Sequence, residues 1–519
     1  MQCRPPPWPA GVVVIYWPHV TENTQRPSLT MNARPCTRHE LIAALRRVLP
    51  PGALLSDPED LRPYECDGLS AYCELPLLVA LPDTTDQARA VLDICRKHGV
   101  PVVARGAGTG LSGGALPLAD GVLLSLAKFN RILEIDEINR TARVQPGVRN
   151  LAISQAVAPA GLYYAPDPSS QIACSIGGNV AENAGGVHCL KYGLTVHNIQ
   201  ALTFLTIEGE LITVGGAALD SPGYDLLALM TGSEGLLGVI VEIVVKLLPR
   251  PERAQVVLAA FDDLEKAGAA VAAIIGAGIV PAGLEMMDNL AIRAAEQFVH
   301  AGYPIEAAAI LLCELDGINE EVSEQILQVR EILNQCGATE SRTACDERER
   351  TLFWAGRKAA FPAVGRLAPD YYCMDGTIPR RRLPAVLRHI AEMSADAGLA
   401  VANVFHAGDG NLHPLILYDA NKAEELERAE RLGGKILELC VAAGGTITGE
   451  HGVGVEKINQ MCVQFSASAL EQFHALKRAF DPHGLLNPGK AVPTLRRCAE
   501  YGAMHVHAGR LPFSDLERF

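Results

Sequence analysis

The chain has 519 residues, which is enough for two to four domains with a substantial apolar core. Its formal net charge of −14 at pH 7 and its scattered Lys and Arg residues argue against nucleic-acid binding, which needs a basic stripe or patch. The 14 cysteines include no Cys-x-x-Cys pair. The sequence therefore has no iron–sulfur or zinc-ribbon spacing and indicates reduced thiols in a cytoplasmic protein.

The N-terminal residues differ in composition from the rest of the chain. An apolar run at 11–17 is flanked by prolines, has little positive charge before it and is too short to span a bilayer. We expect residues 1–40 to be a disordered extension, with Met31 as an alternative start. Residues 41–75 are expected to form a helical lead-in.

Strands and helices alternate after this lead-in. Apolar strands at 77–81 and 100–104 flank an amphipathic helix at 85–98, which ends at Gly99. Together with the strands that follow, they predict an α+β domain over residues 76–251, which ends at a Pro-Arg-Pro sequence. The further strands are expected at 121–126, 132–136, 141–145, 199–206 and 239–248.

The next region, residues 252–465, is richer in Ala, Glu and Leu. Its apolar periodicity predicts a second α+β domain. A helix at 467–480 then begins a C-terminal segment over residues 466–519. Within the second domain, helices are expected at 262–277, 289–300, 319–336 and 423–443, and strands near 307–315 and 401–405.

The first glycine-rich loop, residues 105–114, leaves a strand with backbone amides that no side chain covers, a shape that binds phosphate. Gly108, Gly110 and Gly113 match the Gly-x-Gly-x-x-Gly dinucleotide pattern. A Rossmann loop must open a helix, however, and this chain continues through Pro117 into another strand. A nucleoside-triphosphate loop needs a lysine after its last glycine, and this loop has none.

Two similar loops occur at 166–186 and 231–238. A single loop of this kind is more often a tight turn than a binding site. Three of them in one domain reverse that expectation and predict a long, phosphate-bearing cofactor that lies across all three.

Two histidines seven residues apart, His406 and His413, lie in predicted strands at 403–406 and 412–417. The Asp-Gly pair at 409–410 favours a tight turn, which would place the two histidines directly opposite each other. Opposed side chains have Cβ atoms roughly 4.5–5.5 Å apart, close enough to share one ion. On a helix the same spacing would separate them by about 10.5 Å along the axis, which makes a poor chelate.

Glu450 can add an oxygen ligand, and an open fourth position would make the site catalytic rather than structural. His451 follows directly, and its role depends on an irregular backbone, for which Gly449, Gly452 and Gly454 leave room. The alternative is a polar hairpin with surface histidines. The spacing alone does not decide between the two interpretations.

The glycine-rich loops and the segments at 354–361, 370–379 and 496–505 resemble the flavoprotein family that includes vanillyl-alcohol oxidase and p-cresol methylhydroxylase. The resemblance covers almost everything after residue 40. It lies in the D-2-hydroxyacid dehydrogenase branch, near the FAD-binding subunits of bacterial glycolate oxidases. It implies an α+β fold with a two-subdomain FAD-binding domain of the p-cresol methylhydroxylase type. A substrate (cap) domain with an antiparallel sheet and a C-terminal helical segment that returns to the flavin would complete it.

The resemblance implies FAD as the cofactor, surrounded by residues of all three loops. Family members that attach flavin covalently use a histidine in the first loop. Thr109 stands at that position here, so noncovalent FAD is expected. The implied FAD-binding residues are Arg105, Gly106, Ala107, Gly108, Thr109, Gly110, Leu111, Ser112, Pro166, Asp167, Ser169, Ser170, Ser175, Gly177, Gly178, Asn179, Glu182, Gly235, Gly238, Ile240 and Asn487.

The resemblance also implies a divalent metal ion on His406, His413 and Glu450, with Zn, Mn or Fe as the candidates. It places the catalytic base on His451. Arg357 is implied to bind the substrate carboxylate, for which a guanidinium offers two parallel N–H donors.

The implied activity is FAD-dependent oxidation of a short 2-hydroxy acid, glycolate to glyoxylate and also D-lactate to pyruvate. Hydride would pass to flavin N5 while the metal ion assists deprotonation of the hydroxyl. A D-lactate or D-2-hydroxyglutarate dehydrogenase is an alternative within the family. Cys373 favours a short substrate, because a relative that acts on a longer diacid has a lysine there. A flavin-binding assembly subunit without chemistry and a metal-dependent hydrolase are alternatives from other classes.

Electrons must leave such an enzyme through a partner, because the chain has no iron–sulfur spacing of its own. The expected partners are other glycolate oxidase subunits, including an iron–sulfur electron-transfer subunit, with a quinone-linked carrier or oxygen as other acceptors. The expected location is the cytoplasm, with at most peripheral association at the inner membrane through these subunits.

Overall fold

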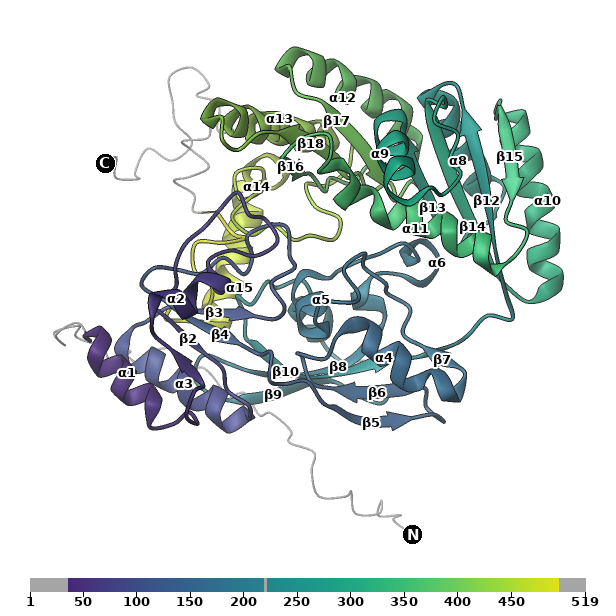
Figure 1. Cartoon of the computed structure of the whole chain (residues 1–519). Coiled ribbons are helices and arrows are strands. Elements are labelled where there is room, and N and C mark those ends of the chain that lie inside the picture. Colours follow the sequence, from purple (N-terminus) through teal and green to yellow (C-terminus); the bar gives the residue numbers. More distant parts are fainter. Residues whose placement is uncertain (1–35, 219–221, 494–519) are drawn as a thin grey trace, which may run out of the picture.

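Figure 1 shows the computed structural model, which describes residues 36–218 and 222–493. Most of the expected extension, including Met31, lies outside the described residues, and so does the segment 496–505. The structure therefore bears on the lead-in, the two predicted domains and the start of the C-terminal segment.

The lead-in joins the first sheet of the FAD-binding domain. Its first helix, α1 (Arg38–Arg46), begins inside the expected extension and not at residue 41, because the Thr37 hydroxyl accepts a hydrogen bond from the backbone N–H of Glu40 and caps the helix there. α1 packs against α3 (Thr85–His98). The sheet has the order β1-β2-β4-β3, in which β2 and β3 run parallel to β4 and β1 is antiparallel to β2. These strands and the short helix are β1 (Leu54–Leu55), α2 (Pro58–Leu61), β2 (Leu78–Ala80), β3 (Val102–Arg105) and β4 (Val122–Ser125).

The first glycine-rich loop runs from β3 to β4, and the described chain forms no helix between these strands. This confirms that the loop is not a Rossmann loop. α3 also ends as expected, because Gly99 takes up the left-handed conformation with φ of 66° and its N–H bonds back to the last turn.

A second, antiparallel sheet has the order β5-β6-β10-β8-β9. α4 (Asn150–Val157) and α5 (Ile176–Glu182) lie on the side of this sheet that faces the cap domain (Figure 1). The predicted two-subdomain architecture is therefore present. The other elements are β5 (Ile132–Asp136), β6 (Thr141–Val144), β7 (Leu162–Tyr163), α6 (Cys189–Tyr192), β8 (Ile199–Leu205), β9 (Leu211–Gly215), α7 (Leu226–Met230), β10 (Val239–Lys246) and β11 (Leu248–Pro249).

The cap domain contains one seven-stranded sheet with the order β15-β12-β14-β13-β17-β18-β16, and all its strand pairs are antiparallel, as predicted. Side chains alternate along β12 (Arg253–Phe261). Val257 and Phe261 face the core with α8, α10, α12 and α13, whereas Val256 and Leu258 face the core with α9 and α11. The sheet is therefore covered by helices on both faces.

Several helices and strands of the cap domain were not expected from the sequence. The strands β12, β13 and β15 were not predicted, and neither were the helices α11, α12 and α14. The cap elements besides β12 are α8 (Leu264–Gly276), β13 (Gly283–Asp288), α9 (Asn289–Val299), β14 (Ala309–Gly317), α10 (Asn319–Gln335), β15 (Glu340–Thr343), α11 (Glu347–Val364), β16 (Asp370–Cys373), α12 (Leu383–Ala397), β17 (Val401–Phe405), β18 (Pro414–Tyr418), α13 (Ala423–Ala442) and α14 (Met461–Gln464).

The chain returns to the first sheet after the cap domain. α15 (Ala467–Phe480) is followed by an extended segment beside β3. There the N–H of Val102 donates to the carbonyl of Leu485, and the N–H of Asn487 donates to the carbonyl of Val102, both at 2.8 Å. The predicted C-terminal return is therefore present. Among the helices of the described ranges, none is both long and apolar enough to cross a bilayer.

Candidate active site

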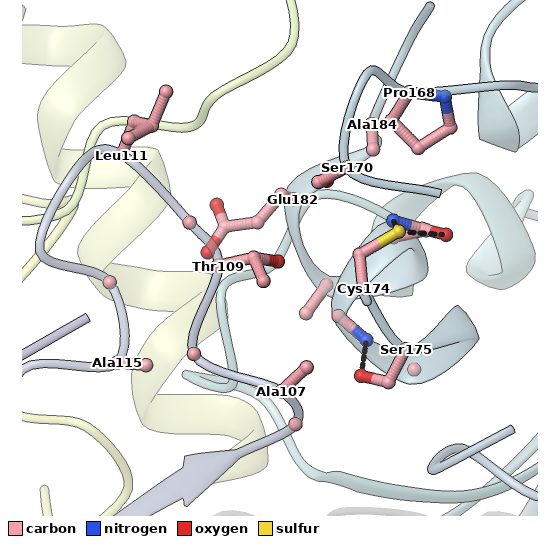
Figure 2. A pocket seen from close by; sticks show the side chains of 18 of the residues that line it. Ala107, Thr109, Leu111, Ala115, Pro168, Ser170, Cys174, Ser175, Glu182 and Ala184 are labelled. Atoms are coloured by element: carbon pink, nitrogen blue, oxygen red, sulfur yellow. Dashed lines mark hydrogen bonds between the residues drawn. The ribbon is translucent and has the colours of Figure 1, made fainter. Parts of the chain in front are cut away.

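A cavity of about 500 Å³ lies where the FAD-binding domain meets the cap domain. The three glycine-rich loops line one side, which we call the loop wall. The other side, which we call the cap wall, comprises Lys358, Phe361 and Pro362 of α11 together with His413, Glu450 and His451. Figure 2 shows the loop wall, where the side chain of Glu182 projects from α5 toward the first loop.

Backbone atoms approach each other closely in the loop wall. A Cβ on Gly106 would overlap the Ser175 hydroxyl, and one on Gly108, where φ is +70°, would overlap the Arg105 guanidinium. Arg105 donates from Nη1 to the carbonyl of Cys66 at 2.7 Å. The first loop therefore presents main chain rather than side chains to the cavity, which suits a phosphate group.

Most of the predicted FAD-binding residues line the cavity. Four do not: Ser112, Pro166, Asp167 and Asn487. Those that line it are Arg105, Gly106, Ala107, Gly108, Thr109, Gly110, Leu111, Ser169, Ser170, Ser175, Gly177, Gly178, Asn179, Glu182, Gly235, Gly238 and Ile240.

The first three of these four residues hold the surrounding loops. The carbonyl of Ser112 accepts from the N–H of Val455 at 3.0 Å, and that of Pro166 accepts from Asn150 Nδ2 at 3.0 Å. Asp167 pairs with Nδ1 of His188 at 2.9 Å.

Asn487 also holds the loops around the cavity without lining it. Its Nδ2 donates to the carbonyls of Gly114, at 2.9 Å, and Glu234, at 2.7 Å. It thus ties the C-terminal return to the first and third loops.

Several lining residues were not among the predicted ones. Most are small or apolar and carry no chemical signal in a sequence. Glu234 is different, because an acidic residue inside a glycine-rich loop could have been singled out. The missed residues are Ala104, Gly114, Ala115, Leu126, Pro146, Cys174, Ala181, Ala184, Glu234, Phe361 and Pro362.

The histidine hairpin forms in a different register from the predicted one. β17 and β18 pair so that His406 lies opposite Asn411, not opposite His413. The difference is two residues, and a shift of two keeps every side chain on its face of the sheet. His413 therefore becomes a diagonal neighbour of His406, with ring centroids 5.1 Å apart.

The turn explains this shift. The N–H groups of Asp409 and Gly410 both donate to the carbonyl of His406, at 3.1 and 3.0 Å. The connection therefore contains four residues, 407–410, instead of the predicted two-residue turn at 409–410. Arg380 holds it by donating from Nε to the carbonyl of Gly408.

The three predicted metal ligands converge on one point. Nε2 of His406 lies 3.2 Å and Nε2 of His413 lies 3.1 Å from the same atom, Oε1 of Glu450. Ligand atoms bound at 2.0–2.1 Å to one tetrahedral zinc ion would be about 3.3 Å apart. The donor set and its spacing therefore fit a divalent ion.

Asp375, which follows β16, was not predicted and lies beside this cluster. One of its oxygens is 3.4 Å from Nε2 of His413. Asp375, His413, Glu450 and His451 have potential ligand atoms that all lie within 4.8 Å of one another, a set that does not include His406. Its carboxylate already accepts hydrogen bonds from the Thr448 hydroxyl at 2.5 Å and from the N–H groups of residues 449–451 at 2.9–3.2 Å. Asp375 therefore holds the loop that carries Glu450, and its Oδ1, which faces His413, offers a further ligand atom beside the three predicted ones.

Glu285 on β13, also not predicted, orients His406. It accepts a hydrogen bond from Nδ1 of His406 at 2.7 Å, which leaves Nε2 directed at Glu450. Metal-binding histidines commonly donate their other ring N–H to such a carboxylate.

Arg357 of α11 pairs with the same Glu285. Its Nε and Nη2 lie 2.9 and 2.6 Å from Oε2, and both side chains are 1% exposed. Arg357 does not line the cavity, whereas Lys358 does. Among the described residues, Nη1 of Arg357 has no hydrogen-bond partner.

Opposite charges govern titration in the cluster. Burial alone would lower the pKa of His406, but Glu285 and Glu450 raise it well above its usual range. Burial alone would raise the pKa of Glu450, but His406 and His413 lower it well below its usual range. A metal cation between these groups would take the place of the shared proton.

His451 stacks on His413, with ring centroids 4.9 Å apart and planes inclined by 5°. Burial lowers the pKa of His451 to about 4, with Asp375 opposing the shift and His413 adding to it. Its Nδ1 is buried and, within the described part of the chain, has no hydrogen-bond partner. A neutral imidazole with a free nitrogen can accept a proton.

Known protein families match both domains. Residues 76–215 match an FAD binding domain, and residues 250–491 match FAD linked oxidases, C-terminal domain. The fold is similar to that of p-cresol methylhydroxylase with substrate bound, with a TM-score of 0.75, 18% identity and coverage of 88% of this chain and 97% of that one. The fold and the cavity thus define an FAD-linked oxidoreductase with a fold of the p-cresol methylhydroxylase type.

Two relatives narrow this class. Over 482 residues the chain is 67% identical to glycolate oxidase subunit GlcD of Escherichia coli (strain K12), covering 93% of this chain and 97% of that protein. Over 463 residues it is 32% identical to a D-lactate dehydrogenase of Anaerostipes hadrus, covering 87% and 97%. The chain belongs to the FAD-linked oxidase family, in the group of glycolate oxidase GlcD subunits.

Proposed function

We propose that the protein oxidises a short 2-hydroxy acid with bound FAD, converting glycolate to glyoxylate and also D-lactate to pyruvate. One observation carries the proposal: a single cavity is lined by the glycine-rich loops and by His413, Glu450 and His451. A cofactor on the loop wall and a substrate on the cap wall would share that space. The names of the two relatives, a glycolate oxidase subunit and a D-lactate dehydrogenase, support this substrate class.

The FAD is proposed to be noncovalent. When bound, FAD supplies the acceptor for a hydride at N5. Thr109 lines the cavity in the first loop, and no histidine is among the described residues that line the loop wall. Denaturation of the holoenzyme is therefore expected to release all flavin into the supernatant, whereas flavin that stays with the precipitate would reject noncovalent attachment.

A divalent ion, Zn, Mn or Fe, is assigned to His406, His413 and Glu450. When bound, the ion acts as a Lewis acid that lowers the pKa of the substrate hydroxyl. The support is the convergence of two imidazole nitrogens on one carboxylate oxygen, together with the carboxylate of Glu285 behind His406.

Arg357 stays the proposed anchor for the substrate carboxylate. Its Nη1 is buried and unpaired among the described residues, so it retains N–H donors for an anion. Lys358 is a second cation for the same charge, because it lines the cavity.

His451 is proposed to take the hydroxyl proton. It lines the cavity beside Glu450, and burial keeps its imidazole neutral. His451 would take the hydroxyl proton, bound FAD would supply the acceptor for the hydride from Cα, and the alcohol carbon would become a carbonyl. Glycolate thus loses one proton and one hydride and becomes glyoxylate.

Reoxidation is proposed to involve other glycolate oxidase subunits, including an iron–sulfur electron-transfer subunit. In the described ranges no cysteine belongs to a potential metal-binding cluster, so this part of the chain offers no iron–sulfur route of its own. The proposed location is the cytoplasm, with peripheral attachment at the inner membrane through these subunits.

Anaerobic mixing of the holoenzyme with glycolate, D-lactate, L-lactate and D-2-hydroxyglutarate tests the function. Glycolate and D-lactate are expected to bleach the flavin absorbance. Bleaching by D-2-hydroxyglutarate alone would assign the protein to the diacid-oxidising relatives. Bound flavin that none of the acids reduces, with metal restored, would indicate an assembly subunit, and a colourless protein that cannot take up FAD would indicate a hydrolase.

A further inference from the structure

We propose that Glu182 keeps its proton at neutral pH and donates a hydrogen bond to the flavin. This inference rests on FAD occupying the cavity, as in the proposed function. The inference assigns a role to Glu182, which lines the loop wall. It also predicts how Glu182 affects the reduction potential of the bound FAD.

Glu182 is the last residue of α5, and its carboxyl group lies between two glycines, one in the first loop and one in the loop that carries Glu450. A Cβ on Gly114 of the first loop would lie 2.6 Å from its Oε1. A Cβ on Gly452, in the loop that carries Glu450, would overlap its Oε2. The carboxyl group is therefore held at the junction of the loop wall and the cap wall.

A second carboxyl group, that of Glu234, lies close to this junction. The same Cβ on Gly452 would lie 3.1 Å from Oε1 of Glu234. Glu234 accepts hydrogen bonds from the N–H groups of Val453 and Gly454, one to each oxygen and both at 2.7 Å. These two donors stabilise Glu234 as an anion.

Glu182 has no comparable support. Its Oε2 is buried and has no hydrogen-bond partner in the part of the chain that the structure describes. An ionised carboxylate without a donor, next to a second carboxylate, is costly in a buried site, so one of the two groups keeps a proton. The hydrogen bonds assign the charge to Glu234 and the proton to Glu182.

The nearby cations do not change this assignment. Nζ of Lys457 lies 2.8 Å from Glu456 and donates to the carbonyl of Gly452 at 2.9 Å. Nζ of Lys490 donates to the carbonyls of Gly114 and Leu116. Each ammonium group is thus already engaged by other oxygens.

The electrostatics agree with this geometry. Burial and the charge of Glu234 raise the pKa of Glu182 well above its usual range, although Lys457 and Lys490 oppose the shift. Burial also raises the pKa of Glu234, but less than that of Glu182, because the N–H groups of Val453 and Gly454 oppose the shift.

The charge state of Glu182 decides how it acts on the flavin. A neutral carboxyl group stabilises the negative charge that a reduced flavin gains, because it donates a hydrogen bond to it, and so raises the reduction potential. An ionised carboxylate would repel that charge and lower the potential. Glutamine has the same shape, carries N–H donors and has no charge, so it mimics only the neutral form.

The test measures the reduction potential of bound FAD with dithionite and reference dyes, in the absence of substrate. Glu182→Gln is expected to leave the potential unchanged, whereas Glu182→Leu is expected to lower it. The matched control is Glu456→Gln, which alters a buried carboxyl group whose pKa burial raises to about 7 but which does not line the cavity. This control is expected to leave the potential unchanged.

Two results would overturn the proposal. A potential that rises in Glu182→Gln would show that the native residue is ionised. A potential that stays the same in Glu182→Leu would show that no hydrogen bond to the flavin exists.

A spectroscopic measurement on the wild-type holoenzyme covers the case in which the leucine variant does not fold. The infrared difference spectrum of chemical reduction is expected to contain a protonated-carboxyl band that is lost in Glu182→Gln and kept in Glu456→Gln. Absence of the band in the wild type would reject the proposal. Because dithionite reduces the flavin here, an enzyme that oxidises no 2-hydroxy acid can still give the expected spectrum.

Discussion

The two walls of the cavity differ in the kind of atoms that they present. The loop wall is rich in Gly, Ala, Ser and Pro and presents mainly backbone to the cofactor. The cap wall carries buried charged side chains around His406, His413 and Glu450. The difference teaches that cofactor recognition depends on shape, whereas substrate activation depends on functional groups. A larger side chain in the loop wall should therefore weaken FAD binding. Removal of a functional group from the cap wall should slow oxidation of the substrate.

The largest effect is expected for Glu450→Gln. This change keeps the size of the side chain but removes the charge on which His406 and His413 converge. Flavin reduction by glycolate should slow on the order of a thousandfold or more, because the Lewis acid is lost, while the FAD content stays normal. Stopped-flow absorbance measures the rate, and Glu427→Gln on the exposed face of α13 serves as the control. Loss of FAD from the Glu450 variant would show that the cap wall also contributes to FAD binding.

A smaller loss is expected for His451→Ala. Removal of a general base typically costs on the order of a hundredfold or more in rate. Since His451 is not an assigned ligand, the variant should keep both FAD and metal, which absorbance and metal analysis determine. An unchanged rate of flavin reduction would remove His451 from the mechanism.

Glu285→Gln tests whether the cap wall depends on support behind its ligands. The variant weakens the hydrogen bond that orients His406 and leaves Arg357 without its anionic partner. Metal affinity, measured by competition with a chelating dye, should fall about 10- to 100-fold. Affinity equal to that of the wild type would mean that Glu285 serves only to neutralise Arg357.

The smallest effect is expected on the loop wall, for Gly177→Ala. Its new Cβ would overlap the Cβ of Pro146, a rigid ring in the same wall. Overpacking of this kind costs about 1–3 kcal/mol, so FAD affinity should fall about tenfold, while flavin that remains bound is reduced at the normal rate. Gly276→Ala, where a Cβ meets no atom within 4 Å, is the control. If Gly177→Ala kept normal FAD affinity but its flavin were reduced slowly, the loop wall would act on the reaction and not on cofactor binding, which would contradict the account.

Local spacing predicted the pair of histidines at the cap wall, whereas Phe361 and Pro362 of that wall were missed. His406 and His413 are seven residues apart, and the strand period of two placed them on one face even though the predicted register was wrong by two residues. The four-residue turn could not be foreseen, because the Asp-Gly pair at 409–410 is a strong signal for a shorter one.

Residues that support the ligands were missed for a different reason. Glu285 lies 121 positions before His406 and reaches it only because β13 pairs with β17. It also lies in a largely apolar strand that was not predicted. Asp375 likewise gains its role from backbone N–H groups of a distant loop. Long-range strand pairing leaves no local pattern in a sequence.

The most direct test is removal of the metal ion. The central claim is that the cap wall activates the hydroxyl of a 2-hydroxy acid while the loop wall holds the electron acceptor in the same cavity. Chelator-treated holoenzyme that retains FAD should lose flavin bleaching by glycolate and regain it with Zn, Mn or Fe, whereas dithionite should reduce both forms equally. Full-rate bleaching by glycolate in the metal-free protein would contradict the claim.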